Sequence, residues 1–245
     1  MPIKNFRFLT LIAMIFVFLT SFFCSLEQTG EGPQFLVSFD PSIQEEPLSG
    51  RVVLLLSNTE QFNVGPNGSP VFGKNVDDLK PGETATIDGM DFGFPVQSLD
   101  DIPAGDYFVQ AYLNVYTTFQ RSDGHTVKLH MDQGEGQNWR RSPGNLFSEP
   151  QKISLDPGQA NTINITMNRK IPPIPAPEDT RWVKNVKIQS DLLTEFWGQP
   201  MFIAARVLLP KGFDDNPEAR YPVVNIQGHF PRGNPGGFRE EPGNP

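Results

Sequence analysis

Cysteine, histidine and positive charge are scarce in this sequence. The single cysteine, Cys24, allows no disulfide within the chain, so packing must supply the stability. The 20 basic residues are outnumbered by 28 acidic ones. The resulting formal charge of -8 argues against a surface that binds nucleic acid, because phosphate binding depends on clustered Lys and Arg. Long helices are not expected either, since 24 Pro and 22 Gly are typical of a chain with many turns.

The amino terminus carries the longest uncharged apolar run, FLTLIAMIFVFLTSFF (8–23), which follows Lys4 and Arg7. This order is typical of a secretory signal, so residues 1–25 are predicted to be a signal peptide or a membrane anchor. The run is somewhat short for a span, which needs about 20 apolar residues. We therefore expect an extracytoplasmic protein, periplasmic or secreted, which contacts a membrane only through this segment.

Cys24 directly follows the apolar run, at the place where a bacterial lipoprotein carries its lipidated cysteine. It is therefore a candidate for lipidation, which would tether the protein to a membrane. Phe22 and Phe23 precede it where small residues are expected, which favours the alternative that Cys24 is incidental.

Short segments of alternating hydrophobicity, separated by turn residues, follow over residues 33–168 and predict an immunoglobulin-like β-sandwich. In the clearest one (101–119), Tyr107, Val109 and Leu113 share one face, and the opposite face is expected to be partly solvated. The predicted strands are 34–39, 51–56, the strand within 101–119, 125–131 and 162–167.

Four side chains after the third of these strands raise the question of a metal site: His125, His130, Asp132 and Glu135. His125 and His130 are an odd number of residues apart, so on a strand they point to opposite faces and cannot bind one ion. The prediction is therefore no metal, no cofactor, and histidines on the surface or in loops.

The loop that follows places Trp139 beside Arg140 and Arg141. An aromatic face flanked by fixed donors can contact a ligand. The alternative is that the loop packs on a neighbouring domain.

A proline-rich segment (169–180) predicts a stiff linker after the sandwich, because four prolines lie between 172 and 177. Beyond it, residues 181–190, 200–213 and 221–229 each have the pattern of a strand. No amphipathic helix is expected between them.

The stretch MFIAARVLLPKGFDDNPEARYPVVNIQGHF (201–230) resembles the opening of the esterase-type α/β-hydrolases. The resemblance covers about residues 180–238, and the sandwich with its linker is similar to the amino-terminal extension of secreted bacterial esterases. It implies a mostly parallel sheet flanked by helices in 181–245, with a Ser nucleophile on a G-x-S-x-G elbow activated by His and Asp or Glu. The implied substrate is a small-molecule or polymer-linked ester.

The sequence contains no such elbow, because no serine has a glycine two positions before it. No catalytic residue is therefore assigned in this chain. In the resembling family the third strand ends in His-Gly, and the next loop supplies N–H donors to the oxyanion. Here the order is reversed, which departs from the family's pattern. By position, Gly228, His229 and Phe230 are still the candidates for that loop, and the alternative is that His229 is a polar residue at a strand end.

A parallel sheet needs helices on both faces, and residues 181–245 offer strands without them. We therefore expect an incomplete α/β-hydrolase domain, and hence an inactive amino-terminal fragment of an exported serine esterase. The alternative is an exported, non-catalytic β-sandwich protein that binds a ligand or serves a structural role in the cell envelope.

Overall fold

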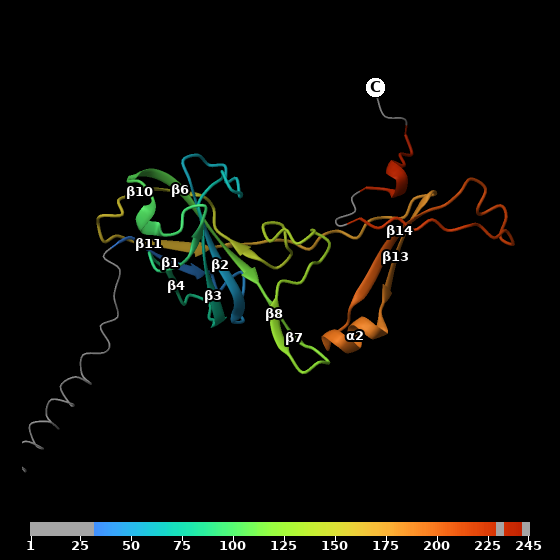
Figure 1. Ribbon diagram of the computed structural model, residues 1–245, viewed down its shortest axis with the longest axis horizontal. Coiled ribbons are helices and arrows are strands. Elements are labelled where there is room, and N and C mark those ends of the chain that lie inside the picture. Colours follow the sequence, from blue (N-terminus) through green and yellow to red (C-terminus); the bar gives the residue numbers. More distant parts are fainter. Residues whose placement is uncertain (1–31, 229–232, 242–245) are drawn as a thin grey trace, which may run out of the picture.

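The structure is a computed structural model that describes residues 32–228 and 233–241. Strands are the dominant secondary structure, so the predicted mainly β class is confirmed. Figure 1 shows two parts, a larger one built from two sheets and a smaller one built on a single hairpin, joined by an extended linker. We call the larger part the two-sheet domain.

The smaller sheet of this domain has three strands in the order β11-β1-β4. The central strand β1 (Gln34–Phe39) pairs in parallel with β11 (Thr162–Met167) and antiparallel with β4 (Ala85–Ile87). Every second residue of β1 and of β11 is buried, as alternation predicts. The two strands predicted at 34–39 and 162–167 are confirmed at those bounds.

The larger sheet has seven strands in the order β12-β9-β6-β2-β3-β5, with β10 also paired to β6. Its two longest strands, β2 and β6, pair with each other and are mostly buried. The bounds are β2 (Leu48–Ser57), β3 (Val71–Leu79), β5 (Gly93–Phe94), β6 (Gly105–Val115), β9 (Leu146–Phe147), β10 (Gln151–Leu155) and β12 (Arg169–Lys170). A short 3-10 helix, η1 (Leu99–Asp101), leads into β6.

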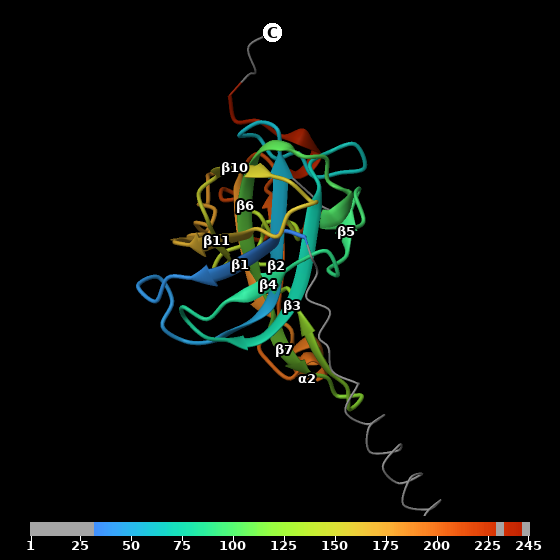
Figure 2. The ribbon, with the colours of Figure 1, turned by 90° about the vertical axis from the view of Figure 1, so that its left-hand side faces the viewer.

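The two sheets face each other across one hydrophobic core, as Figure 2 shows in the view toward this end of the molecule. Phe35, Val37 and Met167 come from the smaller sheet, and Leu54 and Leu113 come from the larger one, all of them fully buried. This layered arrangement is consistent with the predicted β-sandwich.

The outer face of the larger sheet differs from the expectation of a partly solvated surface. Gln110 and Tyr112 of β6 are buried there, and Tyr112 belongs to a second cluster with Leu55 and Phe62. The reason is that the loop joining β8 to β9 lies over this face, which the alternation within β6 alone cannot indicate.

The strand predicted within 101–119 is divided in two. β6 ends at Val115, and β7 (Thr117–Gln120) pairs with β8 (Thr126–Leu129) in a separate hairpin that projects from the domain. The strand predicted at 125–131 is therefore shorter than expected and lies outside the two main sheets.

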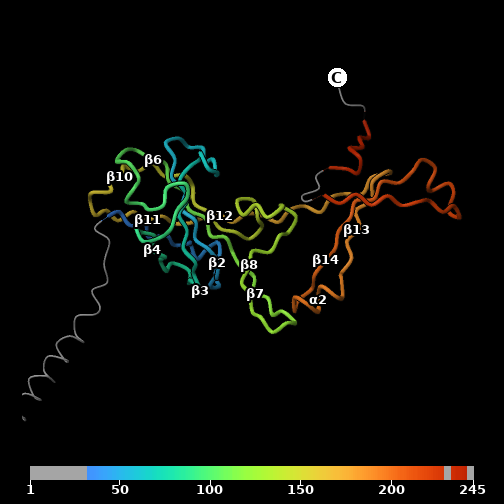
Figure 3. Tube along the Cα trace, in the orientation of Figure 1, coloured from blue at the N-terminus to red at the C-terminus, as the bar shows by residue number. Residues whose placement is uncertain are grey.

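The smaller part of the molecule contains β13 (Val183–Gln189), α2 (Asp191–Trp197) and β14 (Phe202–Leu208). The prediction of no helix here was wrong. Ser190 caps α2, accepting a bond at Oγ from the N–H of Leu193 at 3.3 Å, and Gly198 ends it in the left-handed conformation. The tube in Figure 3 follows the linker from β12 to β13, and β12 itself takes the first two residues of the predicted linker.

The third strand expected at 221–229 is not formed in its described part, residues 221–228. Among the described residues no strand pairs with this segment, and Val223, Val224 and Ile226 are 81%, 82% and 70% exposed. β13 and β14 are antiparallel, so the described residues after 180 contain no parallel sheet. A short 3-10 helix, η2 (Pro235–Gly237), follows.

Within residues 32–228 and 233–241, no helix has the length and hydrophobicity needed to cross a membrane. The predicted signal or anchor segment and Cys24 lie outside the described residues.

Candidate functional site

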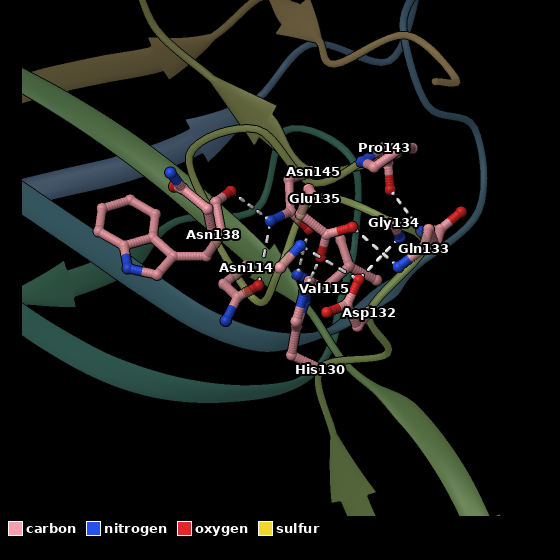
Figure 4. Close-up of polar contacts among 12 residues, drawn as sticks. Asn114, Val115, His130, Asp132, Gln133, Gly134, Glu135, Asn138, Pro143 and Asn145 are labelled. Carbon is pink, nitrogen blue, oxygen red and sulfur yellow. Dashed lines mark hydrogen bonds and ion pairs between the residues drawn. The ribbon is translucent and has the colours of Figure 1, made fainter. Parts of the chain in front are cut away.

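The loop from His130 to Asn145, which joins β8 to β9, brings together most of the candidates from the sequence (Figure 4). Asn145 fixes it to β6. Its Nδ2 donates to Asn114 Oδ1 at 3.0 Å and to the Trp139 carbonyl at 2.7 Å, and its Oδ1 accepts from the N–H of Val115 at 2.9 Å. This buried amide therefore uses both of its polar ends to hold the loop on the sheet.

A fully buried carboxylate lies at the centre of the loop. Glu135 Oε1 lies 2.7 Å from His130 Nε2, and its Oε2 accepts from the N–H of Gln133 at 2.8 Å. The Glu135 side chain has no exposed surface, and that of His130 is largely covered. His130 Nδ1 is buried without a partner among the described residues. A buried carboxylate needs such partners, so this pair is a structural centre of the loop.

Asp132 folds the chain between them. Its Oδ1 accepts from the N–H of Gly134 at 2.7 Å and of Gly136 at 3.3 Å. Both glycines have positive φ angles, which residues other than Gly rarely adopt. Asp132 therefore stabilises the turn that residues 132–136 form.

The two histidines weighed as metal ligands lie in different surroundings. His125 is exposed in the β7–β8 turn, where its Nδ1 lies 3.2 Å from Asp123 Oδ1, whereas His130 pairs with Glu135. Among the described residues, no three His, Cys, Asp or Glu side chains are grouped closely enough to hold a metal ion.

Of the three residues in the predicted ligand-contact loop, two pack against the domain and one is exposed. Trp139 lies edge-on to the Tyr112 ring at 5.2 Å, and Arg140 Nη1 donates to the Phe62 carbonyl at 2.8 Å. Both therefore hold the loop on its own domain, and Arg141 is the exposed member of the three. The adjoining hollow, lined by Gln133, Pro143, Lys170 and nearby residues, is an open depression rather than the enclosed pocket of a small-molecule site.

Of the oxyanion candidates, Gly228 is exposed at the end of the extended segment 221–228. His229 and Phe230 lie outside the described residues, so no oxyanion geometry can be assigned.

A second constellation, not anticipated from the sequence, joins the two parts of the molecule. The Arg121 guanidinium lies over the rings of Phe196 at 5.0 Å and Trp197 at 5.8 Å, and Phe119 packs edge-on against Trp197 at 5.2 Å. The N–H of Ser122 donates to the Phe196 carbonyl at 2.8 Å. We call these contacts between the β7–β8 hairpin and α2 the clasp, and Figures 1 and 2 both show the two elements side by side.

Gly198 makes the close approach in the clasp possible. A Cβ at this position would lie 2.4 Å from the carbonyl oxygen of Gln120, which is far inside van der Waals contact. The sequence signal was the EFWG stretch, in which two aromatics precede a helix-ending glycine, but the partner on β7 could not be read from it.

Each face of the β13–β14 hairpin combines apolar and basic side chains. In its register, Val186 lies opposite Ala205 and Ile188 opposite Ile203, so their side chains share a face with Val207. Lys184, opposite Val207, also lies on this face, and the other face carries Lys187 and Arg206 together with the exposed Phe202 and Leu208. We call Val186, Ile188, Ile203, Ala205 and Val207 the apolar ribbon face, and all five are exposed.

At the start of this hairpin, Asp179 Oδ1 accepts from the N–H of Asn185 at 2.8 Å. This hydrogen bond, aided by the nearby Lys184 ammonium, holds the pKa of the Asp179 carboxyl below its ordinary value.

Comparison of the sequence with protein-family models gives no match. Comparison with the curated proteins and with the solved structures likewise gives no match.

Proposed function

We propose that this chain is the amino-terminal part of an exported, esterase-like serine hydrolase. In this proposal the two-sheet domain is a non-catalytic accessory module, and the β13–β14 hairpin begins the sheet of the α/β-hydrolase unit. The complete protein would cleave a small-molecule or polymer-linked ester by acyl transfer, without a cofactor.

The observation that carries the proposal is the exposed apolar ribbon face. A two-stranded hairpin is at best marginally stable alone in water, and an apolar face with no cover marks a surface that another element occupies. The resemblance of 201–230 to esterase openings supplies the identity of the larger sheet. An incomplete sheet explains why Ile188 and Ile203 are exposed.

The clasp supports the role given to the two-sheet domain. It uses a guanidinium over two aromatic rings, an aromatic pair and a backbone hydrogen bond to hold α2, so the hairpin has a defined orientation on the domain. A module that positions a neighbouring unit needs such a contact, whereas a flexibly tethered binding domain does not.

We further assign the two-sheet domain to the immunoglobulin-like sandwiches. The Tyr107 hydroxyl donates to the Pro103 carbonyl at 2.8 Å. This bond from the start of a strand to the backbone just upstream resembles the tyrosine corner of that fold.

Two measurements test the proposal. The 245-residue chain is expected to show no turnover of p-nitrophenyl esters above background, and the coding sequence after codon 245 should encode a G-x-S-x-G motif, an acidic residue and a histidine. A serine-dependent burst of product from this chain, or a stop codon at position 246, would contradict it.

The alternative, an exported non-catalytic binding or structural protein, is favoured by a different observation. The two-sheet domain exposes Met90, Phe92 and Phe94 together at one sheet edge. Retention of the chain on cell-wall or glycan polymers would support this function, and passage through every such resin would weaken it.

A further inference from the structure

Three large apolar side chains are exposed to solvent at one edge of the seven-stranded sheet. Met90, Phe92 and Phe94 have exposed fractions of 77%, 65% and 52%. They occupy alternate positions leading into β5, which is an edge strand, as Figure 2 shows. We call these three residues the 90–94 ridge.

Asp91 and Gly93, which lie between the ridge residues, are less exposed than their neighbours, and the ridge runs from a turn into the two-residue strand β5. Asp91 forms an ion pair with Lys74 at 3.2 Å. Gly93 is buried, and a Cβ there would lie 2.4 Å from the Phe72 ring. All three large side chains therefore lie on the exposed side of this turn and strand.

Hydrogen bonds fix the backbone of the ridge. The N–H of Gly93 donates to the Gln97 carbonyl at 2.9 Å, and the N–H of Met90 donates to Asp88 Oδ1 at 2.9 Å. The apolar side chains are thus held outward rather than free to turn into the core. A rigid group of exposed large apolar residues is typical of a contact surface.

The chain enters the two-sheet domain beside this ridge. A Cβ on Gly32 would lie 2.6 Å from Asp100 Oδ1, and a Cβ on Gly89 would lie 2.3 Å from Asp100 Oδ2. Gly32 and Gly89 therefore flank one carboxylate, and Met90 is the residue after Gly89. The 31 residues that precede Gly32 include the uncharged run 8–23. The residue at which this part of the chain joins the domain, Gly32, therefore lies beside the ridge.

We propose that the 90–94 ridge contacts the surface of a phospholipid bilayer in which the run 8–23 is retained as an anchor. The surrounding charges select the kind of surface. Asp88 and Asp100 lie beside Met90 and Gly89, and Lys74 is paired with Asp91, so the region is acidic. An uncharged, zwitterionic headgroup layer fits this charge better than an anionic one.

The anchor and the ridge act together. Three side chains bind a bilayer weakly by themselves, because stable membrane attachment normally needs more than one signal. A covalent tether of nine residues, from Cys24 to Gly32, gives the ridge a high effective concentration at the surface. The ridge then orients the two-sheet domain relative to the membrane.

The test places an environment-sensitive fluorophore on the ridge of the full chain in phosphatidylcholine vesicles. In a Cys24→Ser background, Met90→Cys carries the label, and His125→Cys, in the exposed β7–β8 turn, carries it in the matched control. The ridge label is expected to gain severalfold in emission and to be quenched by brominated lipid. The control label should respond to neither.

A second pair of variants distinguishes loss of membrane contact at the ridge from a general effect of adding a charge to the chain. Phe92→Asp is expected to abolish the gain at position 90 while the chain still floats with the vesicles. Leu129→Asp, which changes another exposed apolar residue, should leave the gain intact.

Three outcomes would overturn the inference. They are a ridge label that stays in water while the chain floats, a chain that fails to float, and an emission gain that appears without vesicles. The last would mean that the ridge is covered by another copy of the chain or by the chain itself. Because none of these readouts depends on ester cleavage, the result is independent of the proposed enzymatic function.

Discussion

At the scale of single residues, we expect the pair of Glu135 and His130 to be especially sensitive to substitution. We expect His130→Ala to destabilise the protein by about 3 kcal/mol, because it leaves a fully buried carboxylate without its ring partner. His130→Gln keeps an N–H donor near Glu135 and should lose less. Urea denaturation of the three proteins measures the difference. A cost below about 0.5 kcal/mol for His130→Ala would mean that water already reaches Glu135.

The residues of the 130–145 loop show what sequence reasoning at this scale can and cannot supply. The types were informative, since Trp139 and the acidic residues were singled out in advance. Their roles were not, because burial of Glu135 and the bond from Asn145 to β6 depend on which strand face the loop covers. Which face the loop covers depends on contacts with residues about 30 positions away, and such contacts leave no local pattern in the sequence.

At the scale of elements, Gly198 controls how α2 meets the β7–β8 hairpin. Gly198→Ala adds a Cβ that would lie 2.4 Å from the Gln120 carbonyl oxygen, at a φ of +69° that L residues disfavour. We expect the clasp to open, with severalfold faster hydrogen exchange at the Ser122 N–H. Gly82→Ala is the matched control, because Gly82 has a φ of +76° but open space around it. Equal exchange at Ser122 in both variants would contradict a steric role for Gly198.

The start of the β13–β14 hairpin should respond to acid through Asp179. The pKa of this carboxyl is lowered from 3.8 in the folded chain, so its contribution to stability is present above the unfolded pKa. That contribution is lost as the pH falls through the folded pKa. We therefore expect the Asn185 amide proton shift to titrate with a midpoint below 3.8, and Asp179→Asn to abolish the titration. A midpoint above 3.8 would reverse the sign and refute the hydrogen bond as its cause.

The elements differ in how well they could be predicted, for physical reasons. β1 and β11 have strict alternation and clear turns, and their bounds were found from the sequence. The seven-residue helix α2 is too short for a periodic pattern, so only Ser190 and Gly198 marked it. The segment 221–228 has the composition of a strand but no partner, and a strand needs a neighbour to satisfy its backbone.

At the scale of the whole molecule, the composition and turn spacing indicated a layered β protein with a separate carboxy-terminal part. They could not indicate that β1 pairs in parallel with β11, about 130 residues away, because such pairing depends on long-range packing rather than on local propensity. The relative placement of the two parts was equally hidden, since it rests on the contact of Arg121 with the aromatic rings of α2.

The apolar ribbon face gives a prediction that belongs to the molecule as a whole. Ile203 is 50% exposed in this chain, so Ile203→Glu should change the free energy of unfolding by no more than about 0.5 kcal/mol. It should also reduce concentration-dependent self-association, because it places a charge on an open sheet edge. Sedimentation velocity and urea denaturation test both expectations, with Gln189→Glu on the opposite face as the control.

The same substitution should behave differently once the ribbon face is covered. In a longer protein that completes the sheet, Ile203→Glu would bury an unpaired carboxylate and prevent stable folding. Comparing the two chain lengths distinguishes the effect of a covering element from the stability of the hairpin alone. If Ile203→Glu were tolerated equally well in both proteins, the apolar ribbon face would have no covering element, and the hairpin could not be the start of a larger sheet.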